Sequence, residues 1–482
     1  MSSHPKWATK HKKKGTELRF INGRYYLYEV SSKWDKEKGR ARKITGKLLG
    51  KITREEGFIE SEKALLRKRE LSISKASTKE YGMTAFIDTH LKEYKTLLSK
   101  HFPDHWKQIL ALVYGRLVKQ SPLKNMEHHY LQSYFSEEYK NLTLSPRSLT
   151  SLLRDIGVRR DSITNFFKEF KQAKDNILFD GTDLLSKSKK MSLPKLSKSK
   201  KGNFESLANI MFVFSIGLQV PVYYRLIPGD IKDIKAFSLC LKESCLKDAT
   251  VVADKGFYSE SNLSELKQEG LKYIIPLRRN NKLIDYTPIT SGDKQSFDGF
   301  FEYEKRIIWY YLIKDNNKKE TIVYMDEELK TQEVKDYLNR IEKLPEEYNL
   351  KTFHKKQYSF GTIALMHNTK KKAQEVYLDY KSRGQVEGMI DTMKNTIGAD
   401  KSYMQNEQAL EAWMFINFIA IHWYYKIYQL LIKHNLTSKY SPMDLIMFLS
   451  EIRKVKINNS WITAETTKKT GDLLNKLGIH IT

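Results

Sequence analysis

Four side chains with complementary chemistry recur at helical spacing late in the chain. Tyr380, Arg383, Glu387 and Lys394 fall within an arc of roughly 60° if this segment is an α-helix, because each residue turns the helix by about 100°. A carboxylate flanked by a guanidinium, an ammonium and a phenol suits a site that holds a metal ion and a phosphate together. A solvated helix face with internal ion pairs would have the same spacing. The spacing alone leaves both interpretations open.

Two aspartates have matching surroundings. Asp180 and Asp254 each follow a short apolar run and precede a glycine within two residues, which predicts that each lies at the end of a buried strand where the backbone turns. With Glu387 they would form a cluster of three carboxylates, the hard ligands that Mg²⁺ and Mn²⁺ prefer. Two such ions about 3.5–4 Å apart can activate a water and stabilise the leaving oxygen of a phosphodiester. Each aspartate alone is more simply explained as a turn residue.

The segments around the two aspartates alternate between apolar strands and amphipathic helices. Strands are expected at 177–180, 207–215, 220–227, 250–254 and 272–277, and helices at 230–246 and 260–269. This order predicts an α/β fold with a ribonuclease H-like core. A further strand at 358–366 leads into the helix with Glu387. Residues 186–203 hold seven Lys and no acid, which predicts a mobile loop beside Asp180.

The chain of 482 residues is too long for one hydrophobic core. Its first 70 residues are basic, with 20 Lys and Arg against nine Asp and Glu. The predicted segments are a basic β module at 1–75, a helical DNA-binding domain at 76–172, the first part of a catalytic core at 173–279, an inserted β-rich subdomain at 280–357, the second part of the core at 358–435 and a C-terminal helical tail at 436–482. A packing spacer explains the segment 76–172 equally well.

The charge of the chain favours a polyanionic partner. The chain has 84 Lys and Arg against 57 Asp and Glu, a net charge of +27, and these are interleaved with 28 Tyr, 22 Phe and 7 Trp. Such a mixture is expected where phosphates are neutralised and bases stack. DNA or RNA therefore ranks first as a partner, and an anionic membrane ranks second. Cys240 and Cys245 match no zinc or redox spacing, which favours a reducing, cytoplasmic compartment.

Three blocks of the sequence together resemble one family. The blocks are Asp180 with Gly181 and Thr182, residues 251–259 around Asp254, and the series of Tyr380, Arg383, Glu387 and Lys394. In this order they are similar to the bacterial cut-and-paste DDE transposases of insertion sequences, the family with the Y-R-E-K signature, whose spacing is met without a gap. The resemblance extends over residues 175–435, and the inserted subdomain lies where that family has one.

The resemblance implies a role for each matching residue. Asp180, Asp254 and Glu387 would be catalytic and would bind two Mg²⁺ or Mn²⁺ ions. Tyr380, Arg383 and Lys394 would contact phosphates of the transposon end. The implied reaction is nicking at the ends of the element and strand transfer into target DNA. The implied partners are terminal inverted repeats, target DNA and a second copy of the chain, in the nucleoid of a bacterial cytoplasm.

Some members of that family release their ends through a DNA hairpin, which needs a flipped base held by aromatic stacking. Trp309 in the inserted subdomain is a candidate for this role. Packing within a strand is the simpler interpretation of Trp309. Asp183 and Asp391 compete with the three acids for the metal site and rank below them, and His422 is expected to pack in the core.

Two other functions remain open from the sequence. One is a structure-specific nuclease that cuts DNA without strand transfer. The other is a catalytically inactive DNA-binding regulator that derives from a transposase. The three acids argue against the regulator, because carboxylates beside a polyanion weaken its binding unless cations screen them.

Overall fold

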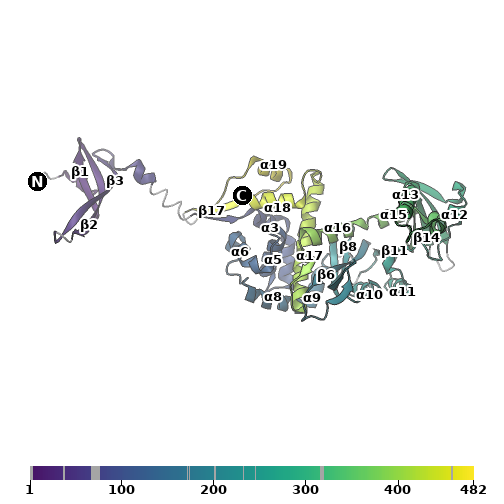
Figure 1. Ribbon diagram of the computed structural model, residues 1–482. Helices are drawn as coiled ribbons and strands as arrows, with labels where there is room; N and C mark the ends of the chain where they lie inside the picture. Colours follow the sequence, from purple (N-terminus) through teal and green to yellow (C-terminus); the bar gives the residue numbers. More distant parts are fainter. Residues whose placement is uncertain are drawn as a thin grey trace. The chain divides into compact units, whose positions relative to one another are not determined.

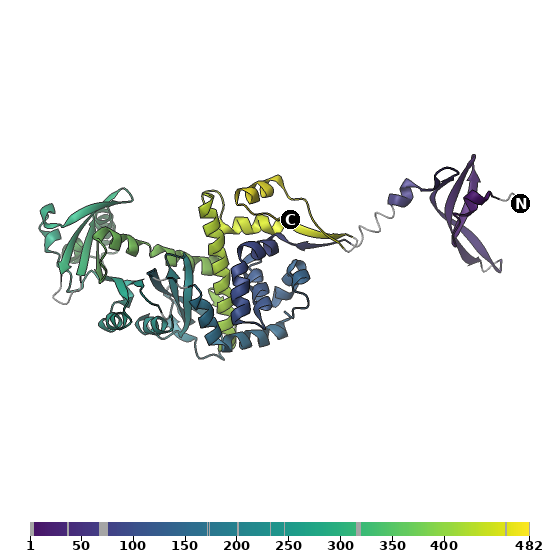
Figure 2. The same cartoon turned by 180° about the vertical axis from the view of Figure 1, so that it is seen from behind.

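The computed structural model describes residues 4–35, 38–66, 76–170, 172, 174–199, 202–231, 233–244, 246–314, 320–457 and 460–481 (Figures 1 and 2). Cys245 lies outside these residues. Contacts divide the chain into two units, one of residues 1–81, 451–467 and 482, the other of residues 82–450 and 468–481. Each unit is described by itself.

The first unit contains a four-stranded antiparallel sheet in the order β1-β2-β3-β4. Its strands are β1 (Thr16–Ile21), β2 (Arg24–Asp35), β3 (Arg40–Thr53) and β4 (Gly57–Glu60). Asn22 and Gly23 join β1 to β2 with φ angles of 48° and 78°, the left-handed pair that a two-residue hairpin turn requires. Helix α1 (Lys6–Thr9) adds Ala8 to a small core with Leu18, Leu27 and Ile52.

A three-stranded sheet in the first unit corrects the prediction of a purely helical tail at 436–482. Its strands are β5 (Ser77–Glu80), β17 (Arg453–Ile457) and β18 (Ser460–Thr463), in the order β18-β17-β5. Helices α18 (Pro442–Glu451) and α19 (Lys468–Lys476) flank the two later strands. In β17, Val455 and Ile457 alternate with lysines, and this period of two favours a strand over a helix.

The second unit begins with a group of helices. They are α3 (Gly82–His90), α4 (Lys92–His101), α5 (Trp106–Val118), η1 (Leu123–Asn125), α6 (Met126–Gln132), α7 (Phe135–Glu138), α8 (Pro146–Val158) and α9 (Arg160–Lys168). Helix α8 has a well-defined start, because Ser145 accepts a hydrogen bond from the Ser148 amide and Pro146 lies in the first turn.

The long helix α17 (Glu407–Lys433) packs against α5 and α8 and also against the sheet strand β9 (Val220–Pro228) (Figures 1 and 2). It is buried over most of its length, including His422, so it forms the centre of the unit. Among the described residues, no helix has the length and apolar character that crossing a membrane requires.

The described residues of the second unit also form an eleven-stranded sheet, so the expected mixed α/β fold is confirmed. Its first strands are β6 (Asn176–Ser186), β7 (Lys195–Lys198), β8 (Phe204–Ser215), β9, β10 (Thr250–Val252) and β11 (Lys272–Leu277). Strand β8 is antiparallel to β6 and β9, whereas β10 is parallel to β6 and β11. Helices α10 (Asp233–Ser244) and α11 (Glu260–Gln268) flank β10 in sequence, and η2 (Lys255–Phe257) follows Asp254.

The segment 280–357 extends the same sheet. Its elements are α12 (Thr287–Thr290), η3 (Lys294–Ser296), β12 (Gly299–Tyr303), β13 (Arg306–Lys314), β14 (Glu320–Asp326), α13 (Glu327–Lys343), α14 (Leu350–Lys356) and η4 (Gln357–Ser359). Strand β14 pairs with β15 (Thr362–His367), and β15 pairs with β11. The remaining elements are α15 (Ala373–Lys381), α16 (Gly384–Asp391), the π-helical η5 (Thr392–Thr396) and β16 (Lys401–Ser402).

The prediction of a mobile loop at 186–203 is wrong for its described residues. Strand β7 forms a ladder with the start of β8. Ser192 donates to the carboxylate of Glu407 at the start of α17, and Ser188 donates to Gln405 at 3.0 Å. Composition predicts disorder here because seven lysines dominate the segment, whereas an edge strand needs only backbone hydrogen bonds.

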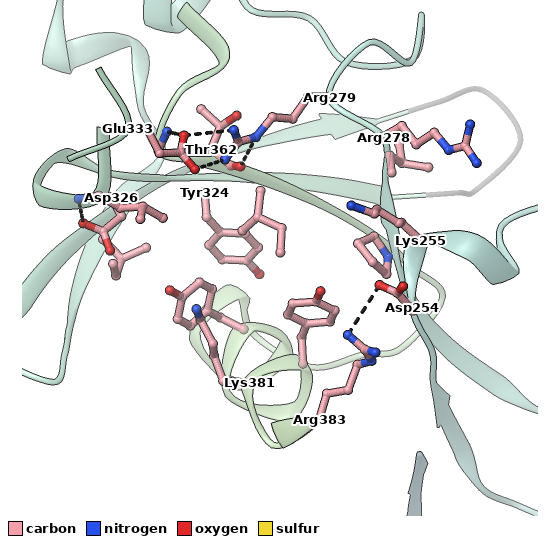
Figure 3. Close-up of a pocket in the computed structure, with 18 residues that line it drawn as sticks. Asp254, Lys255, Arg278, Arg279, Tyr324, Asp326, Glu333, Thr362, Lys381 and Arg383 are labelled. Atoms are coloured by element: carbon pink, nitrogen blue, oxygen red, sulfur yellow. Dashed lines mark hydrogen bonds and ion pairs between the residues drawn. The ribbon is translucent and has the colours of Figure 1, made fainter. Parts of the chain in front are cut away.

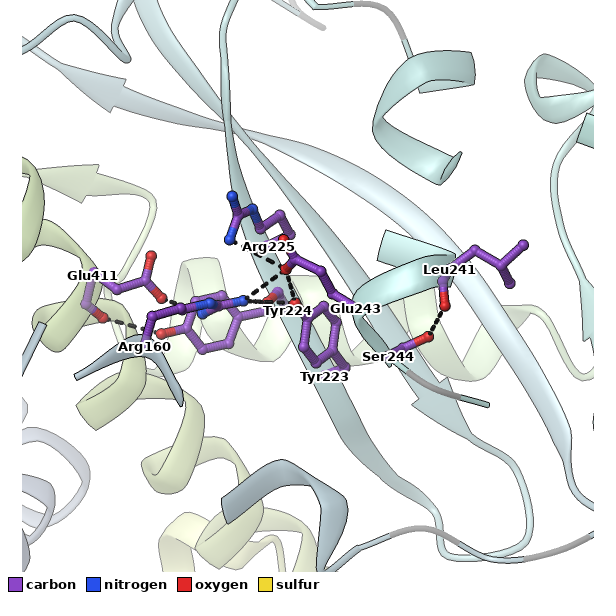
Figure 4. A network of polar contacts seen from close by, with 8 residues as sticks. All are labelled: Arg160, Tyr223, Tyr224, Arg225, Leu241, Glu243, Ser244 and Glu411. Atoms are coloured by element: carbon purple, nitrogen blue, oxygen red, sulfur yellow. Dashed lines mark hydrogen bonds and ion pairs between the residues drawn. The ribbon is translucent and has the colours of Figure 1, made fainter. Parts of the chain in front are cut away.

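A buried polar network fixes the helices of residues 82–168 to the sheet (Figure 4). Arg160 of α9 donates to the Tyr223 hydroxyl at 2.7 Å and to the Tyr224 carbonyl at 3.0 Å, and it pairs with Glu411 of α17. Burial opposes the charge of Arg160, but the carboxylate of Glu411 and the hydroxyls of Tyr224 and Tyr223 together outweigh burial and raise the pKa of Arg160. Glu243 of α10 joins the network through Arg225 at 3.2 Å. The elements α9, β9, α10 and α17 therefore meet at one guanidinium.

Candidate active site

The two aspartates lie at the same level on neighbouring parallel strands. Val252, the last residue of β10, pairs with Leu178 of β6. Two residues further along each chain, Asp254 and Asp180 therefore lie at equivalent positions beyond the end of their shared ladder. This register explains how residues 74 positions apart approach each other.

Asp180 does not end its strand, and the prediction that it does is wrong. Strand β6 continues to Ser186, because residues 181–185 pair with residues 207–211 of β8. Strand β10 has already stopped at Val252, so the other edge of β6 is open beside Asp180. Phe179 packs against Phe237 of α10, with ring centroids 4.8 Å apart, and alternation turns Asp180 to the other face. Helix α16, which carries Glu387, packs against β6.

The helix expected to carry all four signature residues is interrupted, which corrects the prediction of one continuous stripe. Tyr380 lies in α15, Arg383 is the cap residue of α16, Glu387 lies in the first turn of α16 and Lys394 lies in η5. The amides of Arg383 and Val386 bond to carbonyls three residues back, at 3.1 and 3.2 Å, so the chain winds more tightly there. The turn residues Ser382 and Arg383 separate α15 from α16, which begins at Gly384.

The break leaves Arg383 at the centre of the three acids. Its Nη2 lies 3.6 Å from Asp180 Oδ2 and 3.3 Å from Glu387 Oε1, and its Nη1 lies 3.4 Å from Asp254 Oδ1. The Asp180 side chain is 14% exposed, that of Asp254 34% and that of Glu387 59%. The structure thus brings the three acids predicted from sequence around one guanidinium.

The pKa of Arg383 depends on its burial and on the charged groups around it. Burial disfavours its charge, but Asp254 and Asp180, followed by Tyr380 and Glu387, outweigh burial and raise the pKa of Arg383. Its Nε is buried and has no hydrogen-bond partner among the described residues. Burial also raises the pKa of Tyr380, partly offset by Arg383, so the phenol stays protonated at neutral pH.

A cavity of about 780 Å³ opens beside this cluster (Figure 3). Asp254, Tyr380 and Arg383 lie on its wall together with residues that sequence reasoning did not single out, namely Lys255, Arg278, Tyr324, Tyr377 and Lys381. At another part of the wall Arg279 forms two hydrogen bonds of 2.9 Å with Glu333. Helical spacing offered a signal for two of the missed residues, because Tyr377 lies three residues before Tyr380 and Lys381 lies four residues after Tyr377 on α15.

Buried Arg116 of α5 holds the far end of the segment that carries Glu387 and Lys394. Its Nη2 donates to the carbonyl of Ile397 at 2.6 Å and to that of Gly398 at 3.2 Å, and its Nε donates to Asn417 Oδ1 at 2.9 Å. Burial lowers the pKa of Arg116. A cation is favourable at the negative end of a helical segment, so Arg116 fixes where η5 ends.

The other predicted residues have different surroundings. Trp309 of β13 contacts Phe300 and Phe297 at 5.2 and 5.8 Å, and it is absent from the cavity wall that its neighbour Ile308 lines. Asp183 lies near Asp180 and Asp254 on a second cavity, of about 190 Å³. Asp391 is exposed and bonds to Asn395. His422 is fully buried and bonds to the Tyr94 hydroxyl at 3.1 Å.

Metal ligation needs acids that converge. In the part of the chain that the structure describes, no group of three or more His, Cys, Asp or Glu side chains stands ready to hold a metal ion. The three acids instead converge on the guanidinium of Arg383. Hard carboxylate donors gathered around a positive charge are nevertheless a donor set that suits Mg²⁺ or Mn²⁺.

The fold and this cluster define a mixed α/β protein with three acids around a central cation. Residues 171–423 match the family described as Transposase DDE domain, and the chain therefore belongs to this family of enzymes that cut and join DNA. No curated protein matches the chain. Among solved structures, it is similar to a piggyBac transposase in a cryo-EM synaptic complex with hairpin DNA, with 12% identity over 83% of this chain and 85% of that chain and a TM-score of 0.41.

Proposed function

We propose that the protein is a cut-and-paste DNA transposase that nicks phosphodiester bonds at the ends of a mobile element and joins those ends to target DNA. The observation that carries this proposal is the convergence of Asp180, Asp254 and Glu387 on Arg383. Membership of the transposase family supports the same reaction. The bacterial insertion-sequence origin rests on the Y-R-E-K spacing of residues 380–394.

The proposal includes a ribonuclease H-like core. The strand order β9-β8-β6-β10-β11 supports this core. Strands β6, β8 and β9 are antiparallel neighbours, and β10 and β11 run parallel to β6. In this arrangement the first and fourth strands of the core carry the two aspartates. Helix α16 then adds Glu387 from a later segment, after the inserted strands.

Asp180, Asp254 and Glu387 would hold two Mg²⁺ or Mn²⁺ ions. Bound there, the metal would supply Lewis-acid stabilisation of a phosphodiester and a more acidic water. The three acids would then bind the metal ions in place of the guanidinium of Arg383. The guanidinium could then bind a phosphate, because its planar arrangement of donors matches phosphate oxygens. Its buried Nε, which has no partner among the described residues, could donate to the same phosphate.

Tyr380, Arg383 and Lys394 would contact phosphates of the transposon end. Tyr380 and Arg383 lie on the wall of the large cavity, and the half-buried Lys394 follows on the same chain segment. The net charge of +27 supports DNA as the partner. Terminal inverted repeats, a target duplex and a second copy of the chain complete the proposed assembly, in the nucleoid of a bacterial cytoplasm. Trp309 as a stacking residue is not part of this proposal, because it lies off the cavity wall.

The test is Mg²⁺-dependent cleavage of a labelled duplex that carries the inverted repeats flanking the gene. Wild-type protein should nick this duplex and transfer the end into a plasmid. Glu387→Gln should bind the duplex but not cut it, whereas Glu342→Gln, which removes an exposed acid of α13, should cut normally. Cutting by Glu387→Gln would overturn the assignment of the site. Cutting without strand transfer would indicate a nuclease, and binding without cutting by wild type would indicate an inactive regulator.

A further inference from the structure

The ribbon formed by β2 and β3 extends past its neighbouring strands. Strand β1 pairs with β2 only from Arg24 to Glu29, and β4 pairs with β3 only from Gly50 to Thr53. Residues 30–35 and 40–45 therefore form a two-stranded ribbon with no third strand on either side. We call residues 30–35 and 40–45 the β2–β3 ribbon.

Both faces of the β2–β3 ribbon are open to solvent. Nearly all of its residues are exposed, including Trp34 at 63% and Ile44 at 42%. A two-stranded ribbon in water is marginally stable at best, and exposed large apolar side chains add no burial. The ribbon also borders a surface hollow of about 710 Å³, lined by Lys33, Trp34, Arg42 and Lys43 among others.

The cross-strand pairs of the ribbon place like charges together. Lys33 of β2 lies directly opposite Arg42 of β3, and a pair of like charges in this position is destabilising. Neither side chain has an ion-pair partner within the described residues. On the other face, Lys43 lies opposite Ser32 and pairs with Glu17 of β1 at 2.7 Å. An anion bound beside Lys33 and Arg42 would relieve this repulsion.

The dimensions of the ribbon fit duplex DNA. The major groove of B-DNA admits a two-stranded β-ribbon. Six residues of a strand span about 20 Å, close to the length of six base pairs. Lys33 and Arg42, which share one face of the ribbon, could then reach phosphates at the groove edges. Alternation turns Trp34 to the other face.

We propose that the β2–β3 ribbon binds double-stranded DNA by lying in its major groove, with the face that carries Lys33 and Arg42 toward the DNA and these two cations on the phosphates. This inference rests on the proposed function, since it adds a DNA contact to a DNA-cutting enzyme. It assigns that contact to residues of the first unit, whereas the three acids belong to the second. The opposed cations are then stabilised by the phosphates that they neutralise.

The test compares DNA binding by three variants of the full chain. They are the double variant Lys33→Gln with Arg42→Gln, the variant Trp34→Ala, and a control with Lys335→Gln and Lys343→Gln. The control removes two exposed lysines of α13, a helix that carries nearly equal numbers of acids and bases. Binding to a 30-bp duplex of arbitrary sequence, and to one of its single strands, is followed by fluorescence anisotropy between 50 and 300 mM salt.

We expect the Lys33 and Arg42 double variant to bind the duplex at least about tenfold more weakly at 0.1 M salt, with a slope of log K against log salt that is shallower by about 1.8. Trp34→Ala should leave both the duplex affinity and the slope unchanged, because strand alternation turns Trp34 to the face opposite to Lys33 and Arg42. The double variant should melt at the same temperature as wild type or higher, because it loses a like-charge pair. That combination distinguishes lost contacts from lost folding.

Duplex affinity and salt slope equal to those of the control would overturn the inference. So would a loss confined to single-stranded DNA, or a loss of self-association with duplex binding unchanged. Failure of the proposed function has a different signature, because wild type would then bind the duplex without nicking it in Mg²⁺. In that case a weakened double variant would still support the ribbon as a DNA-binding element.

Discussion

Arg383 Nη1 lies 3.4 Å from Asp254 Oδ1, at the point where the acid cluster meets the large cavity. The same guanidinium also reaches Asp180 and Glu387. One side chain therefore supplies the positive charge that three neighbouring carboxylates require. Any cation that binds the acids competes with it.

The first prediction concerns Arg383→Gln. Without the guanidinium, the partly buried acids repel one another, and we expect the free energy of unfolding to fall by about 1–3 kcal/mol in metal-free buffer. Mn²⁺ or Mg²⁺ at millimolar concentration should then raise the melting temperature of Arg383→Gln more than that of wild type, because no arginine competes with the metal. Differential scanning fluorimetry with and without metal measures both effects.

Arg383→Lys is the matched control for this prediction, because it keeps a charge but loses the planar fork. Its melting temperature should lie between those of wild type and Arg383→Gln. Equal metal-induced shifts in all three proteins would show that the guanidinium and the metal do not compete for the acids.

The second prediction concerns Arg116, which ends the segment that carries Glu387 and Lys394. Arg116→Met leaves the buried carbonyls of Ile397 and Gly398 without their donor, and we expect stability to fall by about 3 kcal/mol. Hydrogen exchange of residues 384–398 should accelerate more than that of α9. Arg116→Lys, which cannot make all of these bonds, should be intermediate. Uniform acceleration across the unit would mean that Arg116 only contributes to general stability.

Local patterns predicted the parts of the fold that depend on neighbouring residues. Strand β11 has the predicted bounds of 272–277, because it is a run of apolar and β-branched residues between turn signals. The acids were found for the same reason, since each follows such a run or lies at helical spacing. Their convergence depends on the register between β6 and β10, which no local pattern contains.

The errors arose where distant contacts decide the structure. Asp180 continues its strand because β8 provides partners from residues 207–211. The interruption at Ser382 and Arg383 is followed by a glycine within a helical pattern, but the placement of Arg383 among the acids has no local signal. Arg116 resembles an ordinary polar residue on an amphipathic helix, because apart from the nearby Ser121 carbonyl its acceptors are about 280 and 300 residues away in sequence.

The third prediction concerns pH and His422. Burial lowers the pKa of His422 to about 3, against an ordinary value near 6.5. As pH falls below 6.5, His422 binds a proton in the unfolded chain but not in the folded chain. The free energy of unfolding should therefore decline by about 1.4 kcal/mol per pH unit down to pH 3. Above pH 6.5 both states are neutral at His422 and no such decline is expected.

His422→Gln should remove this contribution, since a glutamine can bond to Tyr94 and to the Pro221 carbonyl without titrating. Urea unfolding at pH 7 and at pH 5 measures how strongly the free energy of unfolding depends on pH in wild type and in the variant. His354→Gln on the exposed face of α14 is the control. An equal loss of stability between the two pH values in wild type and His422→Gln would assign the acid sensitivity to other groups.

The fourth prediction compares two helical glycines. A Cβ on Gly157 of α8 would lie 1.8 Å from the Gln408 carbonyl oxygen and 2.5 Å from its carbon, at the start of α17, whereas a Cβ on Gly471 of α19 meets no atom within 4 Å. Gly157→Ala must push α8 away from α17 and should lower the free energy of unfolding by about 1–3 kcal/mol. Gly471→Ala should raise it by up to about 1 kcal/mol, because alanine loses less backbone entropy in a helix. Urea unfolding of the two variants should therefore give changes of opposite sign. A stabilised Gly157→Ala would mean that α8 and α17 are not in backbone contact, and the long helix would then lack the close packing that sets its position against the sheet.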